Sequence, residues 1–122
     1  MIKFIFIILV TLLSIGCSTV NVKKYNERYY QIQLCEKLGG EMEVVLQDRT
    51  RVDCLTDEYA IEVDFAKKWA EGIGQSLYYA YMTHKKPAIG LIIGQKDSRF
   101  LNRLQKSTKK LNIKIFLIKK KK

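Results

Sequence analysis

The chain contains little proline, glycine, histidine or cysteine. Its 122 residues include one proline, seven glycines, one histidine and three cysteines. So little proline and glycine excludes long linkers, and the length leaves room for a single domain. No internal repeat or low-complexity segment is present apart from a run of lysines at the end. With 48% hydrophobic and 28% charged residues, the composition is that of a globular protein rather than a disordered one.

Negative charge is scarce relative to positive charge. The formal net charge is +10, and lysines crowd the second half in pairs at 67–68, 85–86 and 109–110 and in a run at 119–122. A basic surface of this kind suits a polyanion, either nucleic acid or an anionic membrane surface. The run at 119–122 is equally typical of a solvated tail that keeps a protein soluble.

The first sixteen residues resemble an export signal. Lys3 precedes a predominantly apolar run over 4–13, which is shorter than the ~20 residues that a membrane span requires, and small residues follow. This pattern is typical of a secretory signal peptide. Cys17 resembles the lipidated cysteine of bacterial lipoproteins, although Ser14 stands where leucine is usual. We therefore expect a signal peptide at 1–16, a lipid anchor at Cys17 and a tether over 17–24. An ordinary cleaved signal and an uncleaved anchor remain alternatives.

The expected location follows from the same segment. An exported, lipid-anchored chain would lie in the cell envelope and face the periplasm or the exterior. Ser18 supplies no acidic retention signal, which favours the outer membrane where the host has one. Export also permits a disulfide between Cys35 and Cys54. We expect both cysteines on facing apolar surfaces of a helix and a hairpin, and two unpaired buried thiols are the alternative.

Apolar periodicity predicts three helices and five strands. The helices are expected over 25–38, 66–83 and 98–111, and the strands over 41–47, 51–55, 60–64, 88–93 and 113–118. The first helix should bury Tyr25, Tyr29, Ile32, Cys35 and Leu38, and the second should bury Phe65, Trp69, Ile73, Leu77 and Ala80. Strand 41–47 should place Met42, Val44 and Leu46 on one side. The third helix should begin with Ser98 as its N-cap and bury Phe100, Leu101, Leu104 and Leu111. His84 is expected to end the second helix rather than to act as a catalytic base.

The order helix, three strands, helix, strand, helix, strand predicts an α/β fold on the borderline of α+β. Three sequential strands form a meander, and each strand–helix–strand unit adds a parallel neighbour. We therefore expect a central mixed sheet with helices on both faces, in a domain over 25–118 that is followed by a basic tail at 119–122.

Two acidic residues should meet in the predicted hairpin. If 51–55 and 60–64 pair with 56–59 as the loop, opposed residue numbers sum to 115, so Asp53 faces Glu62 and Arg51 faces Asp64. Cβ atoms of directly opposed residues lie about 4.5–5.5 Å apart. Carboxylates that close repel each other without a cation between them, and Mg²⁺ is a suitable one. The alternative is a ladder of surface charges on an ordinary sheet.

This element order and the pattern D53-x8-E62-V63-D64, followed by K67-K68-W69 and Q75-S76-L77-Y78-Y79, resemble the PD-(D/E)XK nuclease superfamily. The resemblance covers Tyr25 to Leu117 and implies a restriction-endonuclease-like fold that hydrolyses phosphodiester bonds of DNA or RNA. It implies that Asp53, Glu62 and the backbone carbonyl of Val63 hold Mg²⁺ or Mn²⁺. Gln75 and Tyr79 match a glutamine and a tyrosine of the exonuclease branch. Glu36 is the candidate for the carboxylate that the first helix often carries.

The sequence departs from the superfamily at Asp64, where a lysine is usual. Some members carry that lysine on the next helix, and Lys68 shares a helical stripe with Gln75 and Tyr79. We expect Lys68 to act as the catalytic lysine, and Asp64 either to be a further metal ligand or to pair with Arg51. Expected contacts to nucleic acid are Lys67, Lys68, Tyr79, Arg99, Arg103 and Lys106. The alternative function is a catalytically degenerate envelope lipoprotein that acts as a binding or structural module.

Overall fold

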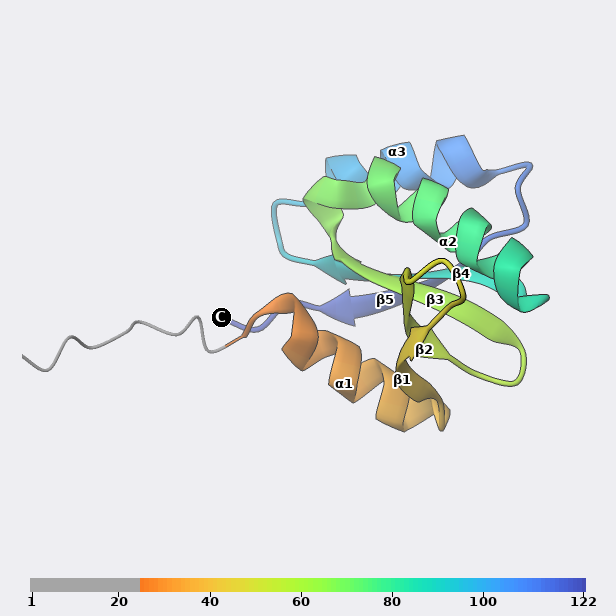
Figure 1. Ribbon diagram of the computed structural model, residues 1–122. Coiled ribbons are helices and arrows are strands. Elements are labelled where there is room, and N and C mark those ends of the chain that lie inside the picture. Colours follow the sequence, from red (N-terminus) through yellow and green to blue (C-terminus); the bar gives the residue numbers. More distant parts are fainter. Residues whose placement is uncertain (1–24) are drawn as a thin grey trace, which may run out of the picture.

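The computed structural model describes residues 25–122, which form three helices on a five-stranded sheet (Figure 1). The elements follow the predicted order: α1 (Glu27–Leu38), β1 (Glu41–Val45), β2 (Arg51–Leu55), β3 (Tyr59–Phe65), the short 3₁₀ turn η1 (Ala66–Lys68), α2 (Trp69–Thr83), β4 (Lys86–Ile93), α3 (Ser98–Thr108) and β5 (Lys114–Lys119).

The expected signal peptide at 1–16, the lipidation site Cys17 and the tether over 17–24 lie outside the described residues. From residue 25 onward, the helices are all too short or too polar to cross a membrane.

The sheet is mixed, as predicted, with strands in sequence order from β1 to β5. The first three strands form an antiparallel meander, and β3, β4 and β5 are parallel neighbours. Helices α2 and α3 cover one face and α1 covers the other (Figure 1). Both crossovers use the same face because each adds its strand in the same direction with the same handedness.

Alternation along β3 and β4 divides the core between the two faces. Ile61, Val63, Ala88 and Ile92 pack with α1, whereas Ile89 and Leu91 pack with the 3₁₀ turn, α2 and α3. Glu62 and Asp64 therefore point toward the face covered by α2. This places two acidic side chains inside the protein.

Helix α1 buries a stripe that overlaps the predicted one, because Cys35 is buried and Tyr25, Tyr29 and Leu38 pack against the core. Its core residues are Tyr30, Leu34 and Cys35, whereas Ile32 is only partly buried. The helix approaches the sheet closely at Gly90, where an added Cβ would lie 2.7 Å from a Leu34 methyl carbon. The helix begins at Glu27, and the Asn26 side chain caps it by accepting a hydrogen bond from the Tyr29 amide.

The other two helices also differ in detail from the prediction. Leu77 of α2 is exposed, and Tyr79 is buried in its place. The N-cap of α3 is Asp97 rather than Ser98, and Leu111 lies beyond the end of that helix and is exposed. His84 is the C-cap of α2, as expected, in the left-handed conformation.

We predicted that Met42, Val44 and Leu46 lie on one side of their strand, and this prediction was wrong. The β1–β2 hairpin changes face at Glu43. Met42 packs with Cys54 on the α1 face, whereas Val44 packs with Val52 near Tyr79 of α2. Glu43 has φ of 56°, in the left-handed region that costs about 1–2 kcal/mol for a residue with a side chain. The local reversal turns the outer half of the hairpin toward α2.

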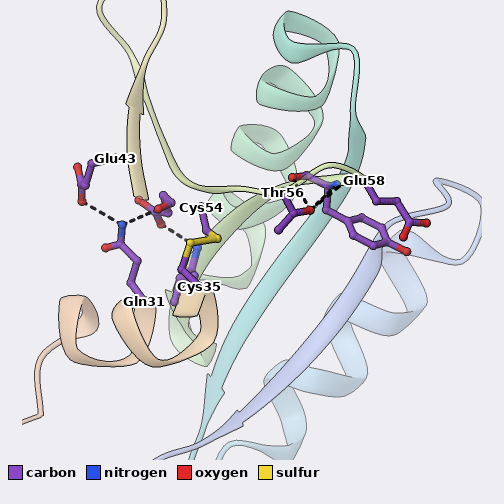
Figure 2. Close-up of a disulfide and its surroundings, with 9 residues drawn as sticks. Gln31, Cys35, Glu43, Cys54, Thr56 and Glu58 are labelled. Carbon is purple, nitrogen blue, oxygen red and sulfur yellow. Dashed lines mark hydrogen bonds between the residues drawn. A yellow bond between two sulfur atoms is a disulfide. The ribbon is translucent and has the colours of Figure 1, made fainter. Parts of the chain in front are cut away.

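The predicted disulfide between Cys35 of α1 and Cys54 of β2 is present (Figure 2). Both cysteines are fully buried. Gly40 passes directly beside the bond, because a Cβ there would lie 2.5 Å from the Cys54 sulfur. The disulfide therefore ties α1 to the hairpin from which Asp53 projects.

Candidate functional site

A polar cavity opens where β2 separates from β3. We call it the acidic cavity; its volume is about 530 Å³, and it is lined by Asn26, Glu27, Arg28, Gln31, Glu43, Arg51, Asp53, Glu62, Gln75 and Tyr79. Four of the predicted site residues, Asp53, Glu62, Gln75 and Tyr79, are thus brought together from three elements. Lys68 and Asp64 do not line the cavity, but they adjoin it through Glu27.

The separation of the strands creates this cavity. The predicted hairpin register is confirmed at Cys54 with Ile61 and at Leu55 with Ala60. Beyond them the ladder ends, and a carboxylate oxygen of Asp53 accepts a hydrogen bond from the Val63 amide at 2.8 Å. Asp53 and Glu62 are therefore not a directly opposed backbone pair, although both side chains reach the same cavity.

Arg51 and Asp64 do not meet, which corrects the prediction that they pair. Arg51 pairs with Val45 of β1 and contacts Glu43 at 3.4 Å. Asp64 instead lies beside Lys68, with 3.5 Å between its Oδ1 and the lysine Nζ. The early end of the β2–β3 ladder removes the register that would have opposed them.

Three acidic groups at this site hold their protons more tightly than usual. Burial raises the pKa of Glu62 to about 9, and the charges of Asp53 and Asp64 add to the effect. Burial also raises the pKa of Asp64 to about 7, with a contribution from Glu27. The pKa of Asp53 rises to about 6, mainly through burial, against the opposing hydrogen bond from Val63. Strongly shifted carboxyl groups in a cavity are typical of functional sites.

Two buried carboxylate oxygens have no hydrogen-bond partner within the described residues, Oε2 of Glu62 and Oδ2 of Asp64. Leaving such atoms unsatisfied costs about 1–3 kcal/mol each, and more when they are charged. Gly72 of α2 lies against the Asp64 oxygen, since a Cβ there would be 3.3 Å from it. Packing alone gives no reason to bury these groups.

Lys68 is the cation next to these acids. Its Nζ lies 3.5 Å from both Glu27 Oε2 and Asp64 Oδ1. The side chain remains half exposed, so it can contact a ligand without leaving its partners. Coulombic attraction to Glu27 raises its pKa above the usual value, which keeps it charged at neutral pH. Lys67, its neighbour in η1, is exposed.

Helix α1 supplies an acidic residue that we did not predict. We expected Glu36, but that residue is exposed and does not line the cavity. Glu27, in the first turn of the helix, lines it instead. The pattern that could have revealed Glu27 is its position directly after the N-cap residue Asn26, since the first turn of α1 is the part that approaches β3.

Glu43 is a second unpredicted member of the site. Its left-handed backbone directs its carboxylate toward Arg28, at 3.3 Å, and Arg51, at 3.4 Å. The amide group of Gln31 donates one hydrogen bond to Glu43 at 3.0 Å and another to the carbonyl of Asp53 at 2.8 Å. Figure 2 shows Gln31 reaching from α1 to Glu43. No local sequence pattern indicates this conformation, because glutamate rarely adopts it.

On α2, Gln75 and Tyr79 lie one turn apart at the cavity. Burial raises the pKa of Tyr79, and the charge of Glu62 adds to the shift. The Tyr79 hydroxyl therefore stays protonated and can donate a hydrogen bond. Of the other tyrosines in the helix, Tyr78 contacts Asp48 in the hairpin turn and Tyr81 is exposed.

The predicted nucleic-acid contacts on α3 lie away from the acidic cavity. Arg99 and Arg103 each pack over the ring of Phe100, and Lys106 is exposed. None of the three lines the cavity. The structure therefore does not bring α3 together with the acidic residues.

The residues at the cavity fit a hard divalent cation. Asp53 and Glu62 offer carboxylate oxygens, which Mg²⁺ prefers, and Mg²⁺ commonly takes only one or two carboxylates and keeps several waters. Within residues 25–122 there is no group of three or more histidine, cysteine or acidic side chains arranged to hold a metal. Asp64, the third acid considered as a ligand, lies beside Lys68.

Comparison with known proteins identifies one distant similarity. The chain is 35% identical over 101 residues to a protein of Acanthamoeba polyphaga mimivirus that is named as containing a KilA-N domain. The match covers 80% of this chain but 39% of that protein, so the chain spans about two fifths of the length of its relative. No protein-family model and no solved structure matches the chain.

Proposed function

We propose that this protein is a metal-dependent nuclease-like protein that hydrolyses phosphodiester bonds of nucleic acid. The observation that supports it best is the set of buried acids at and beside one cavity: Asp53 and Glu62 line it, Asp64 adjoins it, and all three have raised pKa values. Two of their oxygens have no hydrogen-bond partner within the described residues. A bound cation would satisfy the acids, and a phosphate would then complete its coordination.

The ligands in this proposal are Asp53, Glu62 and the backbone carbonyl of Val63, which would hold Mg²⁺ or Mn²⁺. Such a cation, when bound, supplies Lewis-acid polarisation of the phosphate and lowers the pKa of a coordinated water. The Val63 amide holds Asp53 in place, and the Gln31 amide holds its backbone.

Lys68 would neutralise charge on the phosphate as the bond breaks. It is a cation rather than a general base in this role, because its pKa is raised. Asp64 and Glu27 would fix its position. Gln75 and Tyr79 face the same cavity and would donate hydrogen bonds to phosphate oxygens. Preorganised donors and cations of this kind stabilise developing negative charge.

Two further observations bear on the setting. The similarity to a KilA-N domain-containing protein supports a nucleic-acid-binding module. The disulfide between Cys35 and Cys54 suits an oxidising compartment, which agrees with export and with a lipid anchor at Cys17.

The second candidate function is a binding module that has lost catalysis. It is favoured by Asp64, which occupies the position where the resembled superfamily has a lysine. In that case the acidic cavity would bind a cation without cleavage.

The experiment incubates the purified full chain with single- and double-stranded DNA and RNA, with Mg²⁺, Mn²⁺ or EDTA. We expect cleavage that requires the cation and that Asp53→Asn and Glu62→Gln each abolish. Glu36→Gln, an exposed acid on the same helix as Glu27, is the matched control and should cut as the parent does. Absence of cation-dependent cleavage together with retained nucleic-acid binding would favour the binding module.

A further inference from the structure

A second hollow lies at the carboxyl ends of β4 and β5. We call it the lysine groove; its volume is about 1030 Å³, and it is lined by Tyr25, Ile93, Gly94, Gln95, Lys96, Asp97, Lys119, Lys120, Lys121 and Lys122. Five of these residues are lysines, and one, Asp97, is acidic. The Asp97 carboxylate accepts a hydrogen bond from the Gly94 amide at 2.8 Å.

Three of the five groove lysines, Lys119, Lys120 and Lys121, have a backbone that is held by the fold. Lys119 belongs to β5 and pairs with Ile93. The Lys120 amide donates to the Ile93 carbonyl at 2.9 Å, and the Lys121 amide donates to the hydroxyl of buried Tyr30 at 2.9 Å. Three residues of the segment 119–122, which we expected to be a basic tail, are therefore held in place through their backbone. Fixed cations lose less conformational freedom when a ligand binds.

The charges of these lysines are also available to a ligand. Within residues 25–122, no ion pair joins any of the five to a carboxylate. Lys120 instead lies 5.4 Å from the ring centre of Phe65, and Lys121 lies 4.9 Å from that of Tyr29. Such contacts orient an ammonium group and leave its charge in place.

The lysine groove adjoins the acidic cavity across the first turn of α1. Tyr25 lines the groove, while the next two residues, Asn26 and Glu27, line the cavity. Phe65, beneath Lys120, follows Asp64 directly in β3. A strand whose phosphate lies at Glu62 can therefore extend past α1 onto the lysines.

We propose that the lysine groove binds the phosphate backbone of the nucleic-acid strand that flanks the bond to be cut. The inference rests on the proposed function and adds to it the surface that holds the substrate. In this proposal the phosphate backbone is bound by lysines near the end of the chain. It is not bound by Arg99 and Arg103 of α3, which lie away from the acidic cavity. A hollow lined by cations suits a single extended polyanion better than the plane of a bilayer.

The experiment compares two variants of the full chain with the same loss of charge. Lys120→Gln with Lys121→Gln alters the groove and preserves its backbone hydrogen bonds. Lys109→Gln with Lys110→Gln, in the exposed turn after α3, is the matched control. Affinity for a fluorescent 20-nucleotide strand is measured in EDTA between 50 and 200 mM salt, so that binding is measured without cleavage.

We expect the groove variant to bind about tenfold more weakly than the parent and to lower the salt slope by about 1.4, since each lost contact to a single strand contributes about 0.7. The control should change neither value. Equal loss in both variants would overturn the inference, because it would reflect net charge alone. So would a groove variant that binds nucleic acid normally but no longer binds vesicles of phosphatidylglycerol.

The two proposals fail in different ways. A parent that cuts with Mg²⁺, beside a groove variant that binds as the parent does, would overturn the groove alone. A parent that binds through the groove but does not cut would support the groove and overturn catalysis. A parent with no affinity for nucleic acid would overturn both.

Discussion

Lys68 is the cation beside the buried acids, and the proposed function gives it the task of neutralising charge on the phosphate. It replaces a lysine that the resembled superfamily places on the strand, and it reaches the acids from η1, where it lies 3.5 Å from Asp64. Asp64 does not pair with Arg51, which contacts Glu43. Asp64 instead lies beside Lys68, which we propose takes the role of the lysine that the resembled superfamily has at the position of Asp64.

Lys68→Met should lower the rate of cleavage by about 10²–10³-fold, because it removes a cation from the site of developing charge. Affinity measured in EDTA should change little, since one contact among several is lost. Lys67→Met is the matched control, because Lys67 is the exposed neighbour in the same turn. Equal effects of the two substitutions on single-turnover rates would contradict the role of Lys68.

Helix α1 connects the stability of the fold to the geometry of the site. Its inner residues are held by the disulfide between Cys35 and Cys54, and its first turn carries Glu27 to Lys68. Gln31, between them, bonds the backbone of Asp53. Because the disulfide fixes α1 at Cys35, the side chains of Glu27 and Gln31 keep fixed positions relative to each other and to the cavity.

Replacing Cys35 and Cys54 together with alanine should destabilise the domain by about 3 kcal/mol, because the bond closes a loop with a sequence separation of 19. Thermal unfolding followed by circular dichroism should show a midpoint lower by ~10–20 °C. A reductant should lower the midpoint of the parent, given time to reach the buried bond, and leave that of the variant unchanged. Equal midpoints in parent and variant would show that the bond does not stabilise the fold.

We expect the whole domain to be less stable at high pH in the absence of a cation, because it buries acids whose pKa values are raised. The pKa of Glu62 is about 9 in the folded chain, against an ordinary value near 4.5 in the unfolded chain. Between these values the folded state binds more protons than the unfolded state. The free energy of unfolding therefore falls as the pH rises through this interval.

Glu62→Gln should accordingly be more stable than the parent in EDTA at pH 8, on the order of 1–3 kcal/mol. At pH 4 the stabilities of the parent and the variant should differ little from this cause, because Glu62 is then largely protonated in both the folded and the unfolded chain. Urea titrations at the two pH values measure the difference, with Glu36→Gln as the exposed control. Mg²⁺ should stabilise the parent at pH 8 and not the variant. A parent that is equally stable at pH 5 and pH 8 in EDTA would contradict this account of the site.

Local patterns were sufficient for the order of the elements, the register of the β2–β3 hairpin and the pairing of the cysteines. Hydrophobic periodicity depends on neighbouring residues, and a four-residue loop sets which residues of two strands oppose each other. The predicted register pointed to Asp53 and Glu62, which reach the same cavity although the ladder ends before them. Helical spacing pointed to Gln75 and Tyr79. These features needed no knowledge of how distant segments meet.

Other features depend on how α1 and the end of the chain pack against the sheet. Glu27 belongs to the site because Leu34 packs over Gly90, and Glu43 faces its arginines because its backbone reverses where the β1–β2 ladder meets α2. Lys120 and Lys121 are fixed by Ile93 and Tyr30, of which Tyr30 lies 91 residues away along the chain. Contacts over such separations leave no periodic signal in the sequence. Asp53, Glu62 and Lys68 could therefore be found from the residues alone, whereas Glu27, Glu43 and the lysines at the end of the chain could be placed only in the folded chain.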